Sequence, residues 1–123
     1  MIRDFRRTAK IIARAAEAKK AMDIVVLDIR RLTDVADYMV IVGAESSPQM
    51  RAIYEGICES LESLGLRPLH QDGRFTERWL AIDYGGVVVH ILLPPARQFY
   101  RLENLWEGGK AVHWEESRKK GTK

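Results

Sequence analysis

The sequence contains only one cysteine and lacks both a long hydrophobic run and an apolar leader. Each of these features excludes a class of protein. Cys58 has no second cysteine to pair with, which excludes an internal disulfide and any metal site built from several cysteines. No run of about 18 apolar residues is present, so the sequence predicts no membrane span. Because the continuous apolar segment of a secretory signal is also missing, we expect a cytoplasmic protein. The arginine-rich residues 1–16 are equally typical of a mitochondrial presequence, and that alternative stays open.

The motifs of nucleotide and metal chemistry are missing as well. There is no G-x-G-x-x-G and no P-loop lysine, and residues 66–92 lack the Asp-x-Asp or Asp-x-Glu pair with which nucleotidyltransferases hold divalent metals. His70 and His113 have no ligand partners at metal spacing. Residues 43–47 are compatible with a phosphate-binding helix start, but we prefer a structural helix cap. We therefore expect no enzymatic activity, no metal and no cofactor. The alternative is a nucleotidyltransferase-type enzyme that uses a nucleotide and a divalent metal.

Positive charge is scarce in the middle of the chain. Residues 1–20 carry seven Lys and Arg against two acids, and residues 107–123 carry five against three, whereas residues 21–106 carry eight against twelve. A groove that follows phosphates would place Lys and Arg across the folded body. The distribution therefore favours a basic macromolecular partner for the body. A nucleic-acid-binding module that acts through the two basic termini is a further alternative.

Hydrophobic periodicity predicts one α/β domain. Apolar spacings of three and four predict helices, and continuous or alternating apolar runs predict strands. The predicted helices cover residues 2–20, 46–64 and 97–106, and the predicted strands cover residues 24–29, 38–42, 66–70, 79–84 and 87–92. We expect a mixed five-stranded sheet with about three helices in residues 1–107. Residues 108–123 then form a basic, flexible C-terminal tail.

The rest of the domain is organised around a hairpin, Trp79–Leu92, whose two β-prone runs are separated by Gly85 and Gly86. If Tyr84 faces Val87, alternate side chains fall on two faces of the sheet. One set is almost wholly apolar and is the predicted core face: Leu80, Ile82, Tyr84, Val87, Val89 and Ile91. The other set, called the hairpin face below, is mixed: Trp79, Ala81, Asp83, Val88, His90 and Leu92. About three helices are too few to cover both faces of the sheet, so we expect the hairpin face to be partly open.

Asp83 and His90 are diagonal neighbours on the hairpin face, roughly 7 Å apart by strand geometry. This spacing allows a carboxylate to orient an imidazole, but the pair has no nucleophile beside it. We therefore prefer a histidine that is hydrogen-bonded within the sheet face or an interface.

Six separated segments form a recognisable series along the chain: Asp23–Asp28, Ala36–Tyr38, Ser46–Gln49, Arg78–Trp79, Leu80–His90 with its Asp-Tyr-Gly core, and Arg97–Trp106. In this order they resemble the ribosomal silencing factor family, also called Iojap-like proteins. The likeness covers about residues 5–107.

The resemblance implies a nucleotidyltransferase-like fold without catalytic residues, often present as a homodimer. It further implies a translation repressor that binds the large ribosomal subunit through a ribosomal protein on the subunit-joining face. Such a protein would sterically block association with the small subunit. Apart from the resemblance, the basic termini suggest incidental contact with ribosomal RNA. The candidate partner-binding residues are Trp79, Asp83, Tyr84, His90, Phe99, Tyr100 and Trp106.

Overall fold

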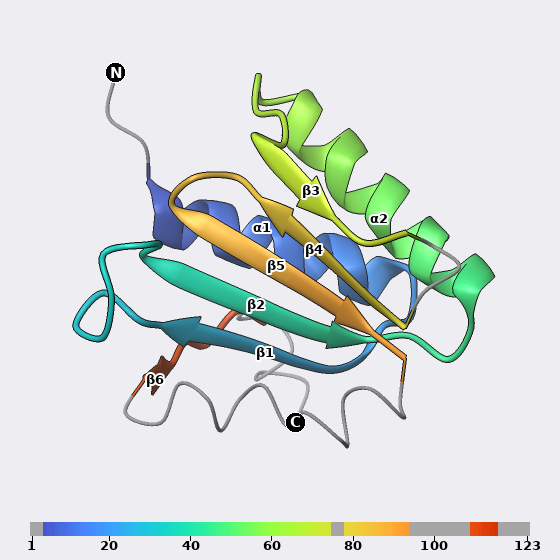
Figure 1. Ribbon diagram of the computed structural model, residues 1–123, viewed down its shortest axis with the longest axis horizontal. Helices are drawn as coiled ribbons and strands as arrows, with labels where there is room; N and C mark the ends of the chain where they lie inside the picture. The colour runs from blue at the N-terminus through green and yellow to red at the C-terminus, as the bar shows by residue number, and fades with distance from the viewer. Residues whose placement is uncertain (1–3, 75–77, 94–108, 116–123) are drawn as a thin grey trace.

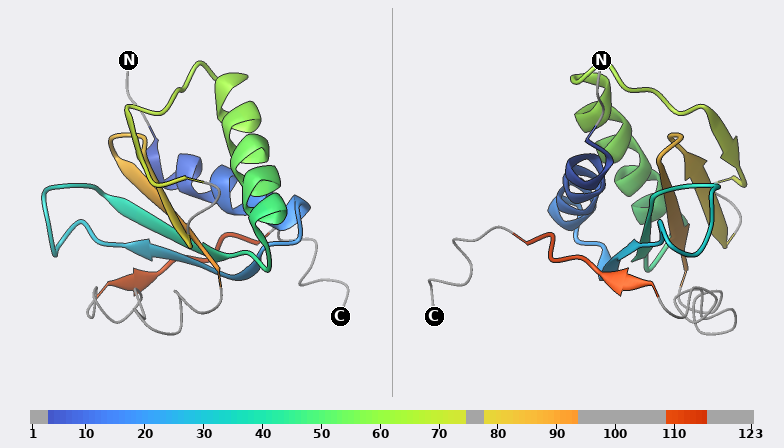
Figure 2. Two further views of the ribbon diagram at one scale, coloured as in Figure 1. Left: turned by 45° about the vertical axis from the view of Figure 1, so that its right-hand side comes forward. Right: turned by 90° about the vertical axis from the view of Figure 1, so that its left-hand side faces the viewer.

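The computed structural model describes residues 4–74, 78–93 and 109–115, and these form one twisted sheet with both helices on one face (Figures 1 and 2). The elements follow in the order α1 (Phe5–Ala18), β1 (Met22–Asp28), β2 (Tyr38–Gly43), α2 (Ser47–Glu62), β3 (His70–Asp72), β4 (Trp79–Asp83), β5 (Val87–Leu92) and β6 (Lys110–Ala111).

The sheet is mixed, as predicted, and its strand order is β3-β4-β5-β2-β1-β6. The central pair, β2 and β5, is parallel, and every other neighbouring pair is antiparallel. The described residues form six strands, so the prediction of five is wrong. The additional strand is β6, which pairs with Leu27 and Asp28 at the end of β1. It lies inside the predicted flexible tail, and a strand of two residues carries no periodicity for a pattern to detect.

The third strand is displaced from its predicted position. The sequence favours residues 66–70, whereas β3 begins at His70 and pairs Gln71 with Ile82 of β4. Leu66 instead packs against the core cluster, and Leu69 is 71% exposed. Pairing with the hairpin therefore decides where this strand lies, against the local apolar pattern.

Both described helices begin at capped positions. Asp4 caps α1 by accepting a hydrogen bond from the Arg7 amide, and Ser46 caps α2 by accepting one from Gln49. The part of the chain that the structure describes thus holds two helices where about three are predicted. The third predicted helix, residues 97–106, lies outside the described residues.

The core lies between the helices and one face of the sheet. Each helix contributes a stripe of fully buried side chains at helical spacing: Ala9, Ile12, Ala13 and Ala16 from α1, and Met50, Ile53, Ile57 and Leu61 from α2. A second, smaller cluster lies on the opposite face of the sheet and consists of Leu27, Ile29, Ala36, Met39, Ile41 and Leu92.

Candidate functional site: the hairpin face

The β4–β5 hairpin has the predicted register. Asp83 pairs with Val88, Ala81 with His90 and Leu80 with Ile91. The Tyr84 amide donates to the Val87 carbonyl at 2.9 Å, which closes the two-residue turn. Within this turn Gly85 has a positive φ of 96°, the conformation for which glycine is favoured.

The predicted division of side chains between the two faces is confirmed. All six residues of the predicted core face belong to the cluster under the helices. On the hairpin face the residues near β3 are partly exposed, and only Leu92 is fully buried, beside the smaller cluster. The expectation of a partly open face therefore holds at five of its six positions, Trp79, Ala81, Asp83, Val88 and His90, and fails at Leu92.

Trp79 and His90 form the main polar contact on the hairpin face. The indole Nε1–H donates to Nδ1 of His90 at 2.9 Å, and the two rings meet edge to face with centroids 5.7 Å apart. Burial disfavours the imidazolium and lowers the pKa of His90 to about 4. The imidazole is therefore neutral near pH 7, with Nδ1 as the acceptor. This confirms a histidine that is hydrogen-bonded within the sheet face.

Asp83 does not orient His90, so the Asp-oriented imidazole that the strand spacing allowed, and that we did not prefer, does not form. One Asp83 carboxylate oxygen accepts a hydrogen bond from the Gly85 amide at 2.7 Å and stabilises the hairpin turn. Trp79 and Asp83 are the two diagonal neighbours of His90, and it is Trp79 that supplies the hydrogen bond. The twist of paired strands makes the two diagonals unequal, and a strand pattern cannot show which one is shorter.

Neighbouring strands continue the hairpin face on both sides. Toward the sheet edge, His70 and Asp72 of β3 lie opposite Asp83 and Ala81, and both β3 residues are exposed. Toward the sheet centre, Met39 and Ile41 of β2 lie opposite Val88 and His90. The surface thus grades from polar and exposed at β3 to apolar and buried at β2, with the Trp79–His90 pair between the two zones.

The other candidate residues are not part of the described hairpin face. Tyr84 is 4% exposed, and its hydroxyl lies 3.6 Å from Cys58 Sγ under α2. It therefore belongs to the core and not to the exposed surface. Phe99, Tyr100 and Trp106 lie outside the described residues.

The helix start considered as a phosphate site is a structural cap. The Gln49 side chain accepts a hydrogen bond from the Glu45 amide at 2.6 Å and donates to the carbonyls of Lys19 and Lys20. The bond to Glu45 satisfies an amide at the start of α2, as a capping side chain does. The bonds to Lys19 and Lys20 join the start of α2 to the end of α1.

Within the described ranges, no three His, Cys, Asp or Glu side chains are grouped so that they could hold a metal ion. In the same part of the chain, neither helix has the length and apolar character needed to cross a membrane. What the described site offers is an aromatic–imidazole pair, carboxylates and partly buried apolar groups, which are the elements of a binding surface.

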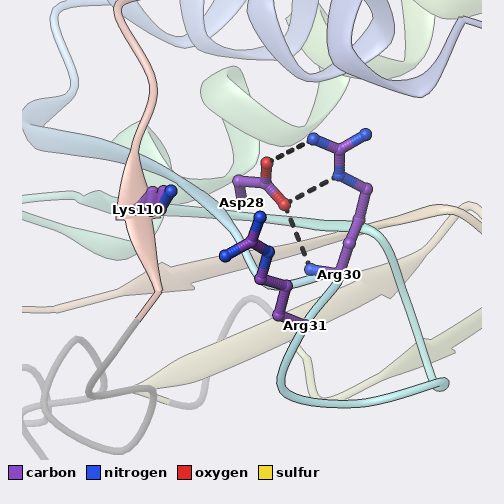
Figure 3. Close-up of a pocket in the computed structure, with 4 residues that line it drawn as sticks. All are labelled: Asp28, Arg30, Arg31 and Lys110. Atoms are coloured by element: carbon purple, nitrogen blue, oxygen red, sulfur yellow. Dashed lines mark hydrogen bonds and ion pairs between the residues drawn. The ribbon is translucent and has the colours of Figure 1, made fainter.

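Sequence reasoning missed one charged cluster. Asp28, Arg30, Arg31 and Lys110 line a hollow where β1, the loop after it and β6 meet (Figure 3). The Arg30-Arg31 pair was a visible signal, but nothing in the sequence placed Lys110 beside it, because β6 was not predicted.

The fold is that of a small α/β protein in which both described helices cover one face of a mixed sheet and the partly exposed hairpin face lies on the other. Comparison with known proteins identifies the kind of α/β protein. The model of the family "Ribosomal silencing factor during starvation" (RsfS) matches residues 3–123. The chain therefore belongs to the ribosomal silencing factor family, which confirms the resemblance seen in its motifs.

Individual relatives agree with this assignment. The chain is 37% identical over 97 residues to the ribosomal silencing factor of Bacillus subtilis, covering 79% of this chain and 82% of that protein. A crystal structure of a protein from Chromobacterium violaceum has a TM-score of 0.81 at 29% identity and covers 94% of this chain and 95% of its own. The mouse protein "Mitochondrial assembly of ribosomal large subunit protein 1" is 30% identical over 91 residues, which are 72% of this chain and 40% of that protein.

Proposed function

We propose that this silencing factor represses translation by binding the large ribosomal subunit through a ribosomal protein on the subunit-joining face. The bound factor then occupies space that the small subunit needs. The hairpin face is the docking surface, and Trp79, Asp83 and His90 are its central residues. The observation that carries this proposal is the partly exposed Trp79–His90 pair on the sheet face opposite the helices.

The chemistry of the hairpin face suits a protein partner. Tryptophan is enriched at the energetic centres of protein interfaces, because a large apolar ring carries a polar N–H. Here that N–H is already bonded to His90, so the indole is held in one orientation before a partner arrives. Asp72 and Asp83 add carboxylates to the same face, and carboxylates complement the basic surface of a ribosomal protein.

The proposal contains three further statements. The fold is nucleotidyltransferase-like but has lost the activity, the protein acts in the cytoplasm, and it forms a homodimer. The mouse relative named for assembly of the ribosomal large subunit supports the choice of that subunit. Incubation with labelled nucleoside triphosphates and Mg²⁺ tests the second candidate, a nucleotidyltransferase-type enzyme. We expect no transferred label, and metal-dependent transfer would favour the enzyme.

Co-sedimentation with purified large subunits tests the docking surface. Ala81→Arg places a long cation between Asp72 and His90, in the middle of the hairpin face. We expect at least tenfold weaker binding, because the long side chain holds a docked protein away from the face and its charge offsets that of Asp72. Ala52→Arg is the matched control, since Ala52 is a partly buried alanine on α2.

A second pair of variants tests the same docking surface with a different substitution. Asp72→Arg changes an exposed acid on β3, and Glu59→Arg makes the same change at an exposed acid on α2. Loss of binding in Ala81→Arg and Asp72→Arg, with binding kept in both controls, supports the docking surface. Wild-type binding in both folded hairpin-face variants contradicts it. Sedimentation equilibrium on the same four variants shows whether this face also holds two copies of the chain together.

A further inference from the structure

Basic side chains that are far apart in the sequence meet along one side of the molecule. The first hollow, of about 370 Å³, is lined by Asp28, Arg30, Arg31 and Lys110. A second hollow, of about 320 Å³, lies along α1 and is lined by Asp4, Arg6, Arg7, Lys10, Ile11 and Arg14. Together the linings contain seven Lys and Arg and two Asp, and we call these seven basic residues the basic edge.

The two hollows lie on elements that pack against each other, because the second runs along α1 and α1 contacts β1. Arg6 lines the second hollow, yet its charge contributes to lowering the pKa of Asp28 in the first. The C-terminal residues are fixed to the same side, because Arg14 Nε donates to the Trp114 carbonyl at 3.0 Å and the Val112 amide donates to Val26. Among the described residues, Lys110 and the basic side chains of α1 are therefore on the same side of the molecule.

Arg30 is held in a defined orientation within the basic edge. Its guanidinium donates to both carboxylate oxygens of Asp28, at 2.9 and 2.7 Å, and lies 5.4 Å from the centroid of the buried Tyr38 ring. This hydrogen bond is the largest cause that lowers the pKa of Asp28 to about 2. Asp28 thus remains charged near neutral pH and is fully engaged by one arginine.

Two other cations of the first hollow and one of the second are available for a ligand. Among the residues that the structure describes, Arg31, Lys110 and Arg6 form no ion pair with a carboxylate, and all three are exposed. Figure 3 shows the lining side chains gathered from β1, its following loop and β6. The hollow therefore offers converging positive charge beside one arginine fixed in place.

We propose that the basic edge binds the phosphate backbone of double-stranded RNA. Arginine and lysine side chains recognise phosphate oxygens, and a row of them neutralises successive phosphates along a duplex. The described residues that line the hollows include no aromatic side chain, so they provide no platform for stacking unpaired bases. The apolar stripe of α1, with Ile12 at its centre, is fully buried in the core, which disfavours insertion of this helix into a membrane surface.

The choice of RNA rests on the proposed ribosomal function, because ribosomal RNA surrounds any protein docked on a subunit. The basic edge and the hairpin face then have separate tasks. The hairpin face recognises a protein, and the basic edge adds an RNA contact that does not depend on base sequence. The sequence suggests only incidental contact of the termini with RNA. The structure adds Arg30 and Arg31, in the loop after β1, to the basic edge.

The test is fluorescence anisotropy with a labelled RNA duplex of about 16 base pairs, a length that spans two minor grooves. The variant is Arg31→Gln with Lys110→Gln, and the matched control is Arg51→Gln with Arg67→Gln on and after α2, where both side chains are exposed. We expect the slope of log K against log salt concentration to fall by about two in the first variant, one unit for each lost phosphate contact. The control should keep the wild-type slope and affinity.

Three outcomes overturn the inference: no RNA binding by the wild type, equal loss in the control, or binding to phosphatidylglycerol-phosphatidylcholine vesicles in place of RNA. Co-sedimentation with large subunits separates this inference from the proposed function. If Ala81→Arg abolishes subunit binding while wild-type protein ignores the duplex, the docking proposal stands and the RNA contact fails. If the duplex result is as expected and the hairpin-face variants bind subunits normally, the RNA contact stands and the docking proposal fails.

Discussion

Trp79 donates its indole N–H to Nδ1 of His90 across the β4–β5 hairpin, at 2.9 Å. The bond requires an unprotonated Nδ1, and burial keeps the imidazole in that state by lowering its pKa to about 4 from 6.5. The orientation of the aromatic ring on the hairpin face therefore depends on the protonation state of one histidine.

Acid should destabilise the protein through His90. Between pH 6.5 and about 4 the unfolded chain binds a proton that the folded chain does not, so the free energy of unfolding falls as the pH falls. The loss amounts to roughly 3 kcal/mol over that window. Urea denaturation at several pH values measures it. The variant His90→Asn keeps an acceptor near Nδ1 and should lose this part of the pH dependence, whereas the exposed-site control His70→Asn should retain it. Equal pH dependence in wild type and His90→Asn contradicts the prediction.

The Trp79–His90 hydrogen bond should contribute about 1 kcal/mol to the free energy of unfolding. A double-mutant cycle of Trp79→Phe and His90→Phe isolates it, because effects of either residue on third groups cancel. Urea denaturation at pH 7.5 supplies the four free energies. A coupling energy near zero would show that this hydrogen bond contributes nothing to the free energy of unfolding.

Gly86 should not tolerate a side chain. A Cβ at this position would collide with the Phe5 ring, while the Gly86 carbonyl accepts hydrogen bonds from the amides of Asp37 and Tyr38. Gly86→Ala should therefore lower the free energy of unfolding by about 1–3 kcal/mol, as overpacking does. Adding Phe5→Leu should recover part of that loss. Thermal denaturation of the two single variants and the double variant checks this, and strictly additive effects would refute the steric cause.

Arg14 should restrain the C-terminal strand. Its Nε donates to the Trp114 carbonyl, and β6 has only two residues to hold it in the sheet. Arg14→Gln should increase hydrogen exchange of the Val112 amide about fivefold, the equivalent of roughly 1 kcal/mol in local opening. Arg7→Gln, on the same helix, serves as the control. An unchanged exchange rate in Arg14→Gln would mean that β6 stays in the sheet without the Arg14 hydrogen bond.

The sequence predicts well wherever one local rule decides the structure. The register of the hairpin follows from a two-residue Gly-Gly loop and strict alternation, which leave little freedom between Trp79 and Leu92. A capped helix start within residues 43–47 follows in the same way from the local sequence, and the structure shows Ser46 as the cap. Family membership follows from separated motifs that occur in order.

Prediction fails where distant segments compete for one position. The strand β3 lies at His70–Asp72 because β4 offers partners there, although the apolar residues Leu66 and Leu69 favour an earlier start. Asp83 bonds the turn and leaves His90 to Trp79, a choice between two diagonals that alternation cannot make. The basic edge joins Arg30 and Arg31 to Lys110, and only the pairing of β6 with β1 brings these residues together.

Subunit joining in vitro tests the central claim most directly. Light scattering follows the association of purified large and small subunits after Mg²⁺ is added, with wild-type protein, Ala81→Arg or Ala52→Arg present in excess. Wild type and Ala52→Arg should reduce joining, and Ala81→Arg should leave it near the level without factor, because only that variant alters the hairpin face. Normal joining with the wild type present, or equal inhibition by a folded Ala81→Arg protein, would contradict occlusion through this surface.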